Sequence, residues 1–202
     1  MKTEALYHKN LIKTIKESQE LNAIDFDAYS VKILVDFLKT SHRRFVDQSI
    51  PKIEQNFLLL TKYFEGNNKL KTIFNLFIKF QINFLEHIQI EERTMFPYAK
   101  TLYKASVSNS IQAVLLIHFS KYSVADFAET HNNNERYLTE IIFLLSREEE
   151  IKRHPLFHIL IKQMCQLDNE IRTHAWIEDN VLVDKVEEIE ETIANYVATQ
   201  KS

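Results

Sequence analysis

The sequence predicts an all-α fold, an up-down-up-down four-helix bundle with an extra short helix at its N-terminus. Apolar residues recur every three or four positions along most of the chain, which is the period of a helix with one buried face. The 202 residues include only one glycine and three prolines, whereas β-sandwiches, barrels and dinucleotide-binding folds need glycines at tight turns. The polar breaks are short, so helices that follow one another are expected to lie antiparallel.

The few breaks divide the chain into five helical segments. The expected helices cover residues 3–20, 28–64, 69–103, 111–147 and 155–197. Pro51 is expected to kink the second of these and Pro97 to disturb the third, because proline removes a backbone hydrogen bond inside a helix. The segments form an N-terminal helical extension, residues 1–24, and a four-helix bundle domain, residues 25–202.

Side chains in the connections favour particular helix ends. Asp25 or Asp27 can cap the first long helix, and Gly66 suits the left-handed conformation that often follows a helix. A polar connection is expected at residues 106–110, and Pro155 suits the first position of the last helix.

Composition excludes several classes of function. The 25 basic and 28 acidic residues give a net charge of −3, so no basic excess indicates a nucleic-acid or anionic membrane surface. No apolar run approaches the roughly 18 residues of a membrane span, and the first residues lack the apolar segment of a secretory signal. The single cysteine, Cys165, excludes cysteine zinc clusters and is expected to be a small buried residue. We therefore expect a cytoplasmic protein that binds neither nucleic acid nor membranes.

Two copies of one motif carry the candidate chemistry. His87-Ile88-Gln89-Ile90-Glu91 and His174-Ala175-Trp176-Ile177-Glu178 each place a histidine and a glutamate four residues apart. Residues with this spacing lie one turn apart on one face of a helix. Both pairs interrupt apolar stripes and should face the interior, where a carboxylate is costly unless it is paired or binds a metal.

A histidine also interrupts the apolar stripe of each of the other two long helices. His42 follows the stripe of the first helix, and His118 follows that of the third. The candidate metal ligands are therefore His42, His87, Glu91, His118, His174 and Glu178. Four imidazoles and two carboxylates suit a pair of borderline metal ions and leave coordination positions open. Iron is the first choice, while manganese and zinc use the same donors.

Each feature also has a purely structural interpretation. A single inward histidine is usually a satisfied core residue, and an isolated His-x3-Glu pair is usually a weak surface interaction. The repetition of the pattern on apolar faces favours metal binding. For the remaining histidines we expect only structural or solvated positions: His8, His131, His154 and His158.

The two motifs resemble the hemerythrin-like, or HHE cation-binding, domain, and most closely the repair-of-iron-centres di-iron family. The resemblance rests on His42, on His118 and on the residues after each glutamate, which are Met95-Phe96-Pro97 in the first motif and Asp179-Asn180-Val181-Leu182 in the second. It covers about residues 25–197.

The resemblance implies roles for the six residues. The four histidines would be terminal ligands of two iron ions, and Glu91 and Glu178 would bridge the ions together with an oxo or hydroxo group. It implies a role in nitrosative or oxidative stress, through donation of iron to damaged iron–sulfur proteins or through reaction with O2 or NO. A homodimer is compatible with this family.

The chain also departs from the family. The 41 residues before His42 contain no cysteine, whereas the full-length repair proteins have an N-terminal domain with a cysteine pair. No fifth histidine completes the ligand set of the oxygen-carrying hemerythrins. The absent cysteine domain favours an alternative, a module that senses or binds O2, NO or iron without turnover and signals to a partner through residues 3–20. A helical bundle without metal is the third hypothesis.

Overall fold

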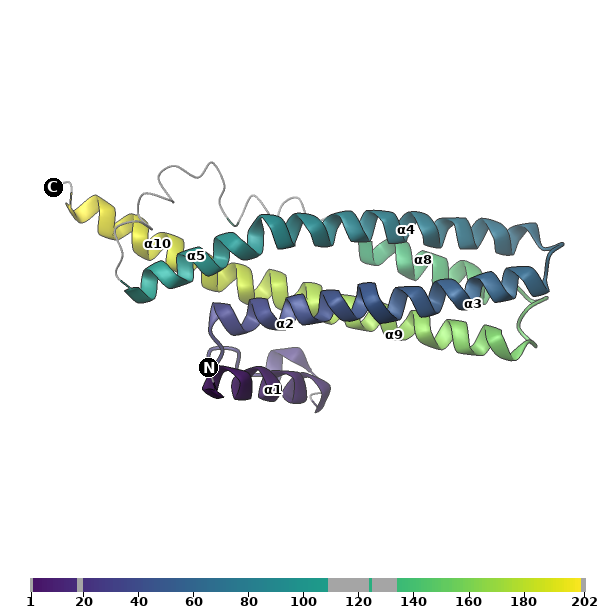
Figure 1. Ribbon diagram of the computed structural model, residues 1–202, viewed down its shortest axis with the longest axis horizontal. Helices are drawn as coiled ribbons and strands as arrows, with labels where there is room; N and C mark the ends of the chain where they lie inside the picture. The colour runs from purple at the N-terminus through teal and green to yellow at the C-terminus, as the bar shows by residue number, and fades with distance from the viewer. Residues whose placement is uncertain (1, 18–19, 109–123, 125–133, 201–202) are drawn as a thin grey trace. The chain divides into compact units, whose positions relative to one another are not determined.

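The computed structural model describes residues 2–17, 20–108, 124 and 134–200 (Figure 1), and this part of the chain is helical and contains no β-strand. The predicted all-α class is confirmed. The helices are α1 Lys2–Glu17, α2 Val31–Arg44, α3 Ile50–Tyr63, α4 Asn68–Arg93, α5 Met95–Ser108, α8 Asn134–Ser146, α9 Pro155–Ile177 and α10 Val183–Gln200. Three short helical turns lie between some of these helices: the 3-10 turn η1 Leu21–Ala23 and the π turns η2 Phe45–Ser49 and η3 Glu178–Leu182.

The chain forms two compact units. Unit 1 comprises Met1–Thr40, Ile90–His131 and Ala175–Ser202, and unit 2 comprises Ser41–Gln89 and Asn132–His174. The up-down-up-down order of a single four-helix bundle stays a prediction. Within the described residues no helix is both long enough and apolar enough to cross a bilayer.

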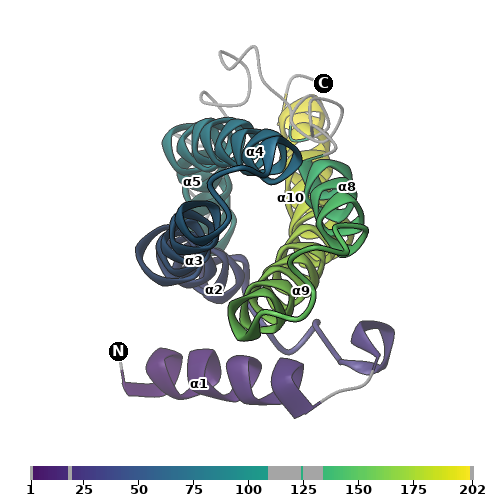
Figure 2. The same ribbon diagram turned by 90° about the vertical axis from the view of Figure 1, so that its right-hand side faces the viewer.

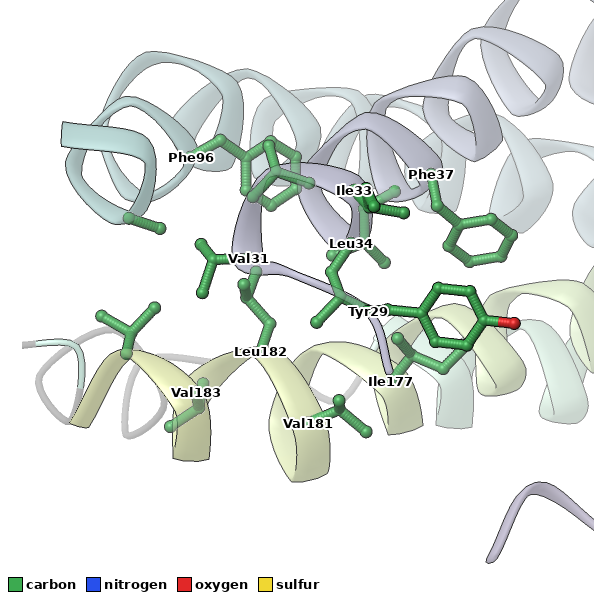
Figure 3. Packing of buried hydrophobic residues seen from close by; sticks show 14 of the residues in the cluster. Tyr29, Val31, Ile33, Leu34, Phe37, Phe96, Ile177, Val181, Leu182 and Val183 are labelled. Carbon is green, nitrogen blue, oxygen red and sulfur yellow. The ribbon is translucent and has the colours of Figure 1, made fainter. Parts of the chain in front are cut away.

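Unit 1 has a core of branched aliphatic and aromatic side chains (Figure 3). Leu34 and Phe37 of α2, Phe96 of α5 and Leu182 of η3 are buried in it. Leu11 of α1 is fully buried in the same core. The amphipathic spacing of each helix accounts for this burial, because one apolar stripe from each helix faces the others.

Unit 2 is a helical, bundle-like unit in which α3, α8 and the segments of α4 and α9 that belong to it run alongside one another (Figure 2). Its core is rich in phenylalanine, and Phe45, Phe57 and Phe77 are fully buried. Phe57 and Phe77 are neighbours, with ring centroids 5.3 Å apart. Burying each such ring stabilises the unit by about 1.5–3 kcal/mol.

An irregular turn lies close to each of the two prolines, as expected, while the kink at Pro51 itself stays a prediction. Pro51 lies in the first turn of α3, directly after the π turn η2. In η2 the backbone N–H of Ile50 donates to the carbonyl of Phe45, five residues earlier. Since proline has no N–H and its ring crowds the carbonyl four residues back, a wider turn just before Pro51 relieves that conflict. A break at Thr94 separates α4 from α5, three residues before Pro97.

Several details of the helix ends correct the sequence predictions. The side chain that caps α2 is neither Asp25 nor Asp27 but Ser30, whose Oγ accepts the Ile33 N–H at 3.4 Å. Asp25 instead accepts the N–H of Asp27 within the preceding turn. Gly66 lies in the expected turn, but its φ is outside the left-handed range.

The structure also tests the predicted helix bounds and the predicted burial of Cys165. Helix α5 continues to Ser108, beyond the predicted end near residue 103. Pro155 begins α9 as predicted. Cys165 is exposed, not buried, because it lies beside the buried stripe of α9 and not on it. Most of the N-terminal part of the predicted helix at residues 111–147 lies outside the described residues, and α8 is the C-terminal part of that helix.

Candidate metal centre

Four of the five ligand candidates among the described residues are buried, and His87 is half-buried. His42, Glu91, His174 and Glu178 are 1%, 4%, 5% and 1% exposed. Such burial is rare for glutamate unless a partner or a metal offsets the loss of water. The sequence-based prediction that these polar residues interrupt buried faces is therefore confirmed.

The two histidines of unit 2 that lie on α2 and α9 form a close pair. The Nε2 atoms of His42 and His174 are 3.0 Å apart, and the ring centroids are separated by 4.6 Å. The edge of the His174 ring meets Phe45, at 5.8 Å between centroids, and Phe45 in turn contacts Phe84. The imidazole pair thus lies in an apolar surrounding that limits access of water.

Glu91 joins this pair to make a group with the chemistry of a metal site. One ligand atom from each of His42, Glu91 and His174 lies within 4.8 Å of the other two, and all three residues are buried. Two imidazole nitrogens and a carboxylate oxygen are a common ligand set for iron, manganese and zinc. This cluster could hold a metal ion.

The separation of the two Nε2 atoms fits two ligands of one ion. With metal–imidazole bonds of about 2.1 Å, two nitrogens at a right angle lie about 3.0 Å apart, while a tetrahedral angle separates them by about 3.4 Å. The observed 3.0 Å matches the right angle. A hydrogen bond from one neutral imidazole to the other has the same length, so metal content is the measurement that separates the two states.

The structure places the other predicted ligands less closely. Glu178 is the first residue of the π turn η3 and is buried, and His87 is half-buried on α4 with its ring 6.4 Å from that of Phe84. Neither belongs to the group formed by His42, Glu91 and His174. His118 lies outside the described residues. A second metal position therefore stays a prediction.

Two of the histidines expected to be structural or solvated behave as predicted. His158 is exposed. His154 is half-buried, its ring lies 4.3 Å from that of Tyr63, and its Nδ1 accepts the N–H of Leu156 at the start of α9. His154 therefore has a structural role at a helix end.

Sequence reasoning missed two features next to the histidine pair. The first is the ion pair between Arg44 and Glu170. No local sequence pattern indicates this pair, because the two residues are 126 positions apart. The second is the π turns, one beginning three residues after His42 and the other four residues after His174. Single-turn π-helical segments inside longer helices occur frequently at functional sites.

Comparisons with protein-family models, with curated proteins and with solved structures give no match to this chain.

Proposed function

We propose that the chain is a non-haem di-iron protein of the hemerythrin-like type that acts in the response to nitrosative or oxidative stress. The observation that carries the proposal is the buried His42–His174 pair, with 3.0 Å between Nε2 atoms and the Glu91 carboxylate in the same group. The resemblance of the two His-x3-Glu motifs to that family supports it, as does the burial of Glu91, His174 and Glu178. The proposal includes the up-down-up-down order of the four helices that is typical of that family.

The chain's own residues would prepare the site for metal. His42 and His174 would each present an Nε2 lone pair to one ion, and imidazole suits iron as well as manganese and zinc. His87 and His118 would serve the second ion. The carboxylates of Glu91 and Glu178 would offset the positive charge in a buried place where water cannot.

The apolar shell would tune this chemistry. Phe45 packs against His174, and Phe84 packs against Phe45. These rings reduce the access of water, which raises the effective strength of charge interactions in the site. Iron would supply the redox change and the affinity for a diatomic such as NO or O2. Repair of iron–sulfur proteins by iron donation is the related activity that the resemblance implies.

Metal analysis of protein purified without added metal tests the ligand assignment. We expect about two iron ions per chain, and oxo-to-iron charge-transfer bands in the absorption spectrum of the oxidised protein. The double variant His42→Ala, His174→Ala should lose at least one ion per chain, whereas His158→Ala, which removes an exposed histidine from α9, should lose none. If the wild-type protein instead contains no metal and melts at the same temperature with and without chelator, that result would favour a structural role for the histidines.

Two assays then test the function. The iron-loaded protein should reactivate an enzyme with a damaged iron–sulfur cluster, or its reduced form should consume NO. A protein that holds iron but does neither would contradict the stress-repair proposal. Ligand-dependent binding of a partner without turnover would then favour the sensing module.

A further inference from the structure

A groove on the surface of unit 2 lies between α3 and α4. It has a volume of about 710 Å³, and its walls are residues of α3 and α4 on either side of the Phe64–Asn67 turn. Leu58 and Leu59 line it and are 50% and 48% exposed. Phe74 also lines it, is half-buried, and stacks on the fully buried Phe57 with 5.4 Å between ring centroids. The floor of the groove is therefore apolar and continuous with the core of unit 2 beneath it.

Two adjacent, half-exposed leucines on a well-packed helix need an explanation in this structure. The inward positions of α3 are already filled by Ile53, Phe57 and Leu60. Leu58 and Leu59 therefore contribute little to the core of unit 2, and they leave apolar surface in contact with water. Contiguous apolar surface with a polar rim is typical of a binding site for another molecule.

The charge around the groove indicates which chemistry would occupy it. Residues 51–79, which span α3, the turn and the first part of α4, contain five lysines and two glutamates, so this segment carries +3 in a chain of net charge −3. Lys62 of α3 and Lys71 of α4 line the groove from its two walls and are exposed. Neither ammonium group pairs with another described residue. Glu65 is the one acidic residue of the lining.

We propose that this groove, lined by Leu58, Leu59, Lys62, Lys71 and Phe74, binds an acidic amphipathic helix of a partner protein. Apolar side chains of that helix, spaced three and four residues apart, would pack on the two leucines and on Phe74. Its glutamates or aspartates would approach the two lysine ammonium groups, which steer an acidic partner and fix its orientation. The lysines are available for this contact because they hold no ion pair within the described part of the chain.

The test uses the full-length protein and a synthetic helical peptide of about four turns as the probe. The peptide has leucines at positions i, i+3, i+4 and i+7 with glutamates on both sides of that stripe, and a matched control peptide has lysines in place of the glutamates. Fluorescence anisotropy should give a Kd on the order of 10 μM for the acidic peptide and no saturable binding for the basic one. The affinity should fall as ionic strength rises.

Variants assign the binding to the groove. Lys62→Glu with Lys71→Glu should weaken binding by at least about tenfold, and Leu58→Ser with Leu59→Ser should weaken it similarly. Lys52→Glu with Lys79→Glu changes the charge of the same segment by the same amount outside the groove lining and should have a small effect. Ile159→Ser removes a half-exposed apolar side chain elsewhere on unit 2 and should have none. Circular dichroism checks that each variant is folded.

Several outcomes would overturn the proposal. One is absence of saturable binding to the acidic peptide, and another is equal weakening by the groove pair and the control pair of charge reversals. Self-association of the protein that Leu58→Ser with Leu59→Ser abolishes would identify a second copy as the occupant. Binding to phosphatidylserine vesicles through Lys62 and Lys71, without binding to the peptide, would identify an anionic membrane surface instead.

Discussion

Arg44 and Glu170 form an ion pair that joins α2 to α9, with 3.2 Å between the Arg44 Nη2 and Glu170 Oε2 atoms. Arg44 follows His42 by two residues, and Glu170 precedes His174 by four, which is one helical turn. The guanidinium carbon of Arg44 also lies 5.8 Å from the centre of the Phe45 ring, and Phe45 contacts His174. The ion pair and the aromatic contact therefore hold together the two helix segments that carry the histidine pair.

Replacing Arg44 should weaken metal binding more than it weakens the fold. The pair is partly exposed, with side chains 39% and 21% accessible, so Arg44→Ala should lower the free energy of unfolding of the metal-free protein by no more than about 1 kcal/mol. Loss of the link between α2 and α9 should lower metal affinity by about tenfold, because misplaced supporting groups cost this much in other metal sites. Competition with a calibrated chelator measures the affinity.

The matched control for this variant is Arg172→Ala. Arg172 pairs with Asp168 on the surface of α9, at 2.9 Å, and donates to the Thr139 hydroxyl of α8 at 2.7 Å, so Arg172→Ala removes a surface ion pair and a link to α8. Arg44→Lys should recover part of the affinity because it keeps the charge. Equal loss of affinity in Arg172→Ala and Arg44→Ala would show that the Arg44–Glu170 pair has no special role in holding the histidines.

Replacing the buried glutamates should affect the metal-loaded and metal-free proteins differently. Glu91→Gln and Glu178→Gln keep the side-chain volume but remove the negative charge. Without metal, a neutral amide at these positions avoids the cost of burying a charge, so the free energy of unfolding should change little. With metal, the lost charge should lower affinity by about tenfold or more. Thermal melting with and without metal, together with metal titration, measures both effects.

The control for the glutamate variants is Glu92→Gln. Glu92 is half-buried beside Glu91 and pairs with Lys39 at 3.4 Å, so this variant makes the same chemical change next to the proposed ligand. Metal affinity should stay at the wild-type value in Glu92→Gln. If Glu91→Gln also retained full affinity, Glu91 would have no place among the ligands.

Removal of the metal should lower the melting temperature of the whole chain. A ligand that binds only the folded state stabilises it by RT ln(1 + [L]/Kd), which is about 2.7 kcal/mol at a hundred times Kd and corresponds to roughly 5–10 °C for a chain of this size. Chelator-treated protein should melt lower by this amount, and added Fe(II) under anaerobic conditions should restore the original value. The variant His42→Ala, His174→Ala should show a smaller difference in melting temperature with and without chelator than the wild-type protein, since it lacks two of the proposed ligands.

The sequence sufficed to predict most of the described helices and the burial of four candidate ligands, His42, Glu91, His174 and Glu178, whereas His87 is half-buried. Helical periodicity alone placed Glu91 and Glu178 on buried faces, because the apolar stripe and the polar pair share one period. The close approach of His42 to His174 spans 132 positions of the chain, and no local pattern specifies such a separation. The resemblance to a known family suggested a common site, while the distance itself required the structure.

The helix ends show where local reasoning fails. Several polar side chains near a helix start can cap it, and backbone geometry selects among them. Ser30 lies directly before α2, whereas Asp25 and Asp27 are held in the preceding turn. In the same way Asn67 caps α4, since its Oδ1 accepts the Leu70 N–H at 2.8 Å and its amide donates to Glu150 across unit 2.

The π turn η2 had a sequence signal that a simple three-and-four period overlooks. Phe45 and Ile50 are both buried although they are five residues apart, whereas consecutive inward positions of an α-helix are three or four apart. The π turn adds one residue to the helix. It therefore lets His42 and Phe45 before the turn and Ile53 after it face the same interior of unit 2.

Deleting one residue from η2 should remove the π turn without reorienting either part of this helix. Gln48 is exposed, and its removal would leave Phe45 and Ile50 four positions apart, which is an ordinary spacing of inward positions in an α-helix. Inserting an alanine after Gln48 should instead turn the helix after it by about 100° relative to the part before it, so that either Ile50 and Ile53 or His42 and Phe45 leave the interior. The insertion should therefore cost several kcal/mol of stability and abolish metal binding, whereas the deletion should retain metal binding. Denaturant unfolding and metal content measured on both proteins provide the comparison, and an insertion variant with wild-type stability and metal content would mean that the residue count of η2 does not set the orientation of His42.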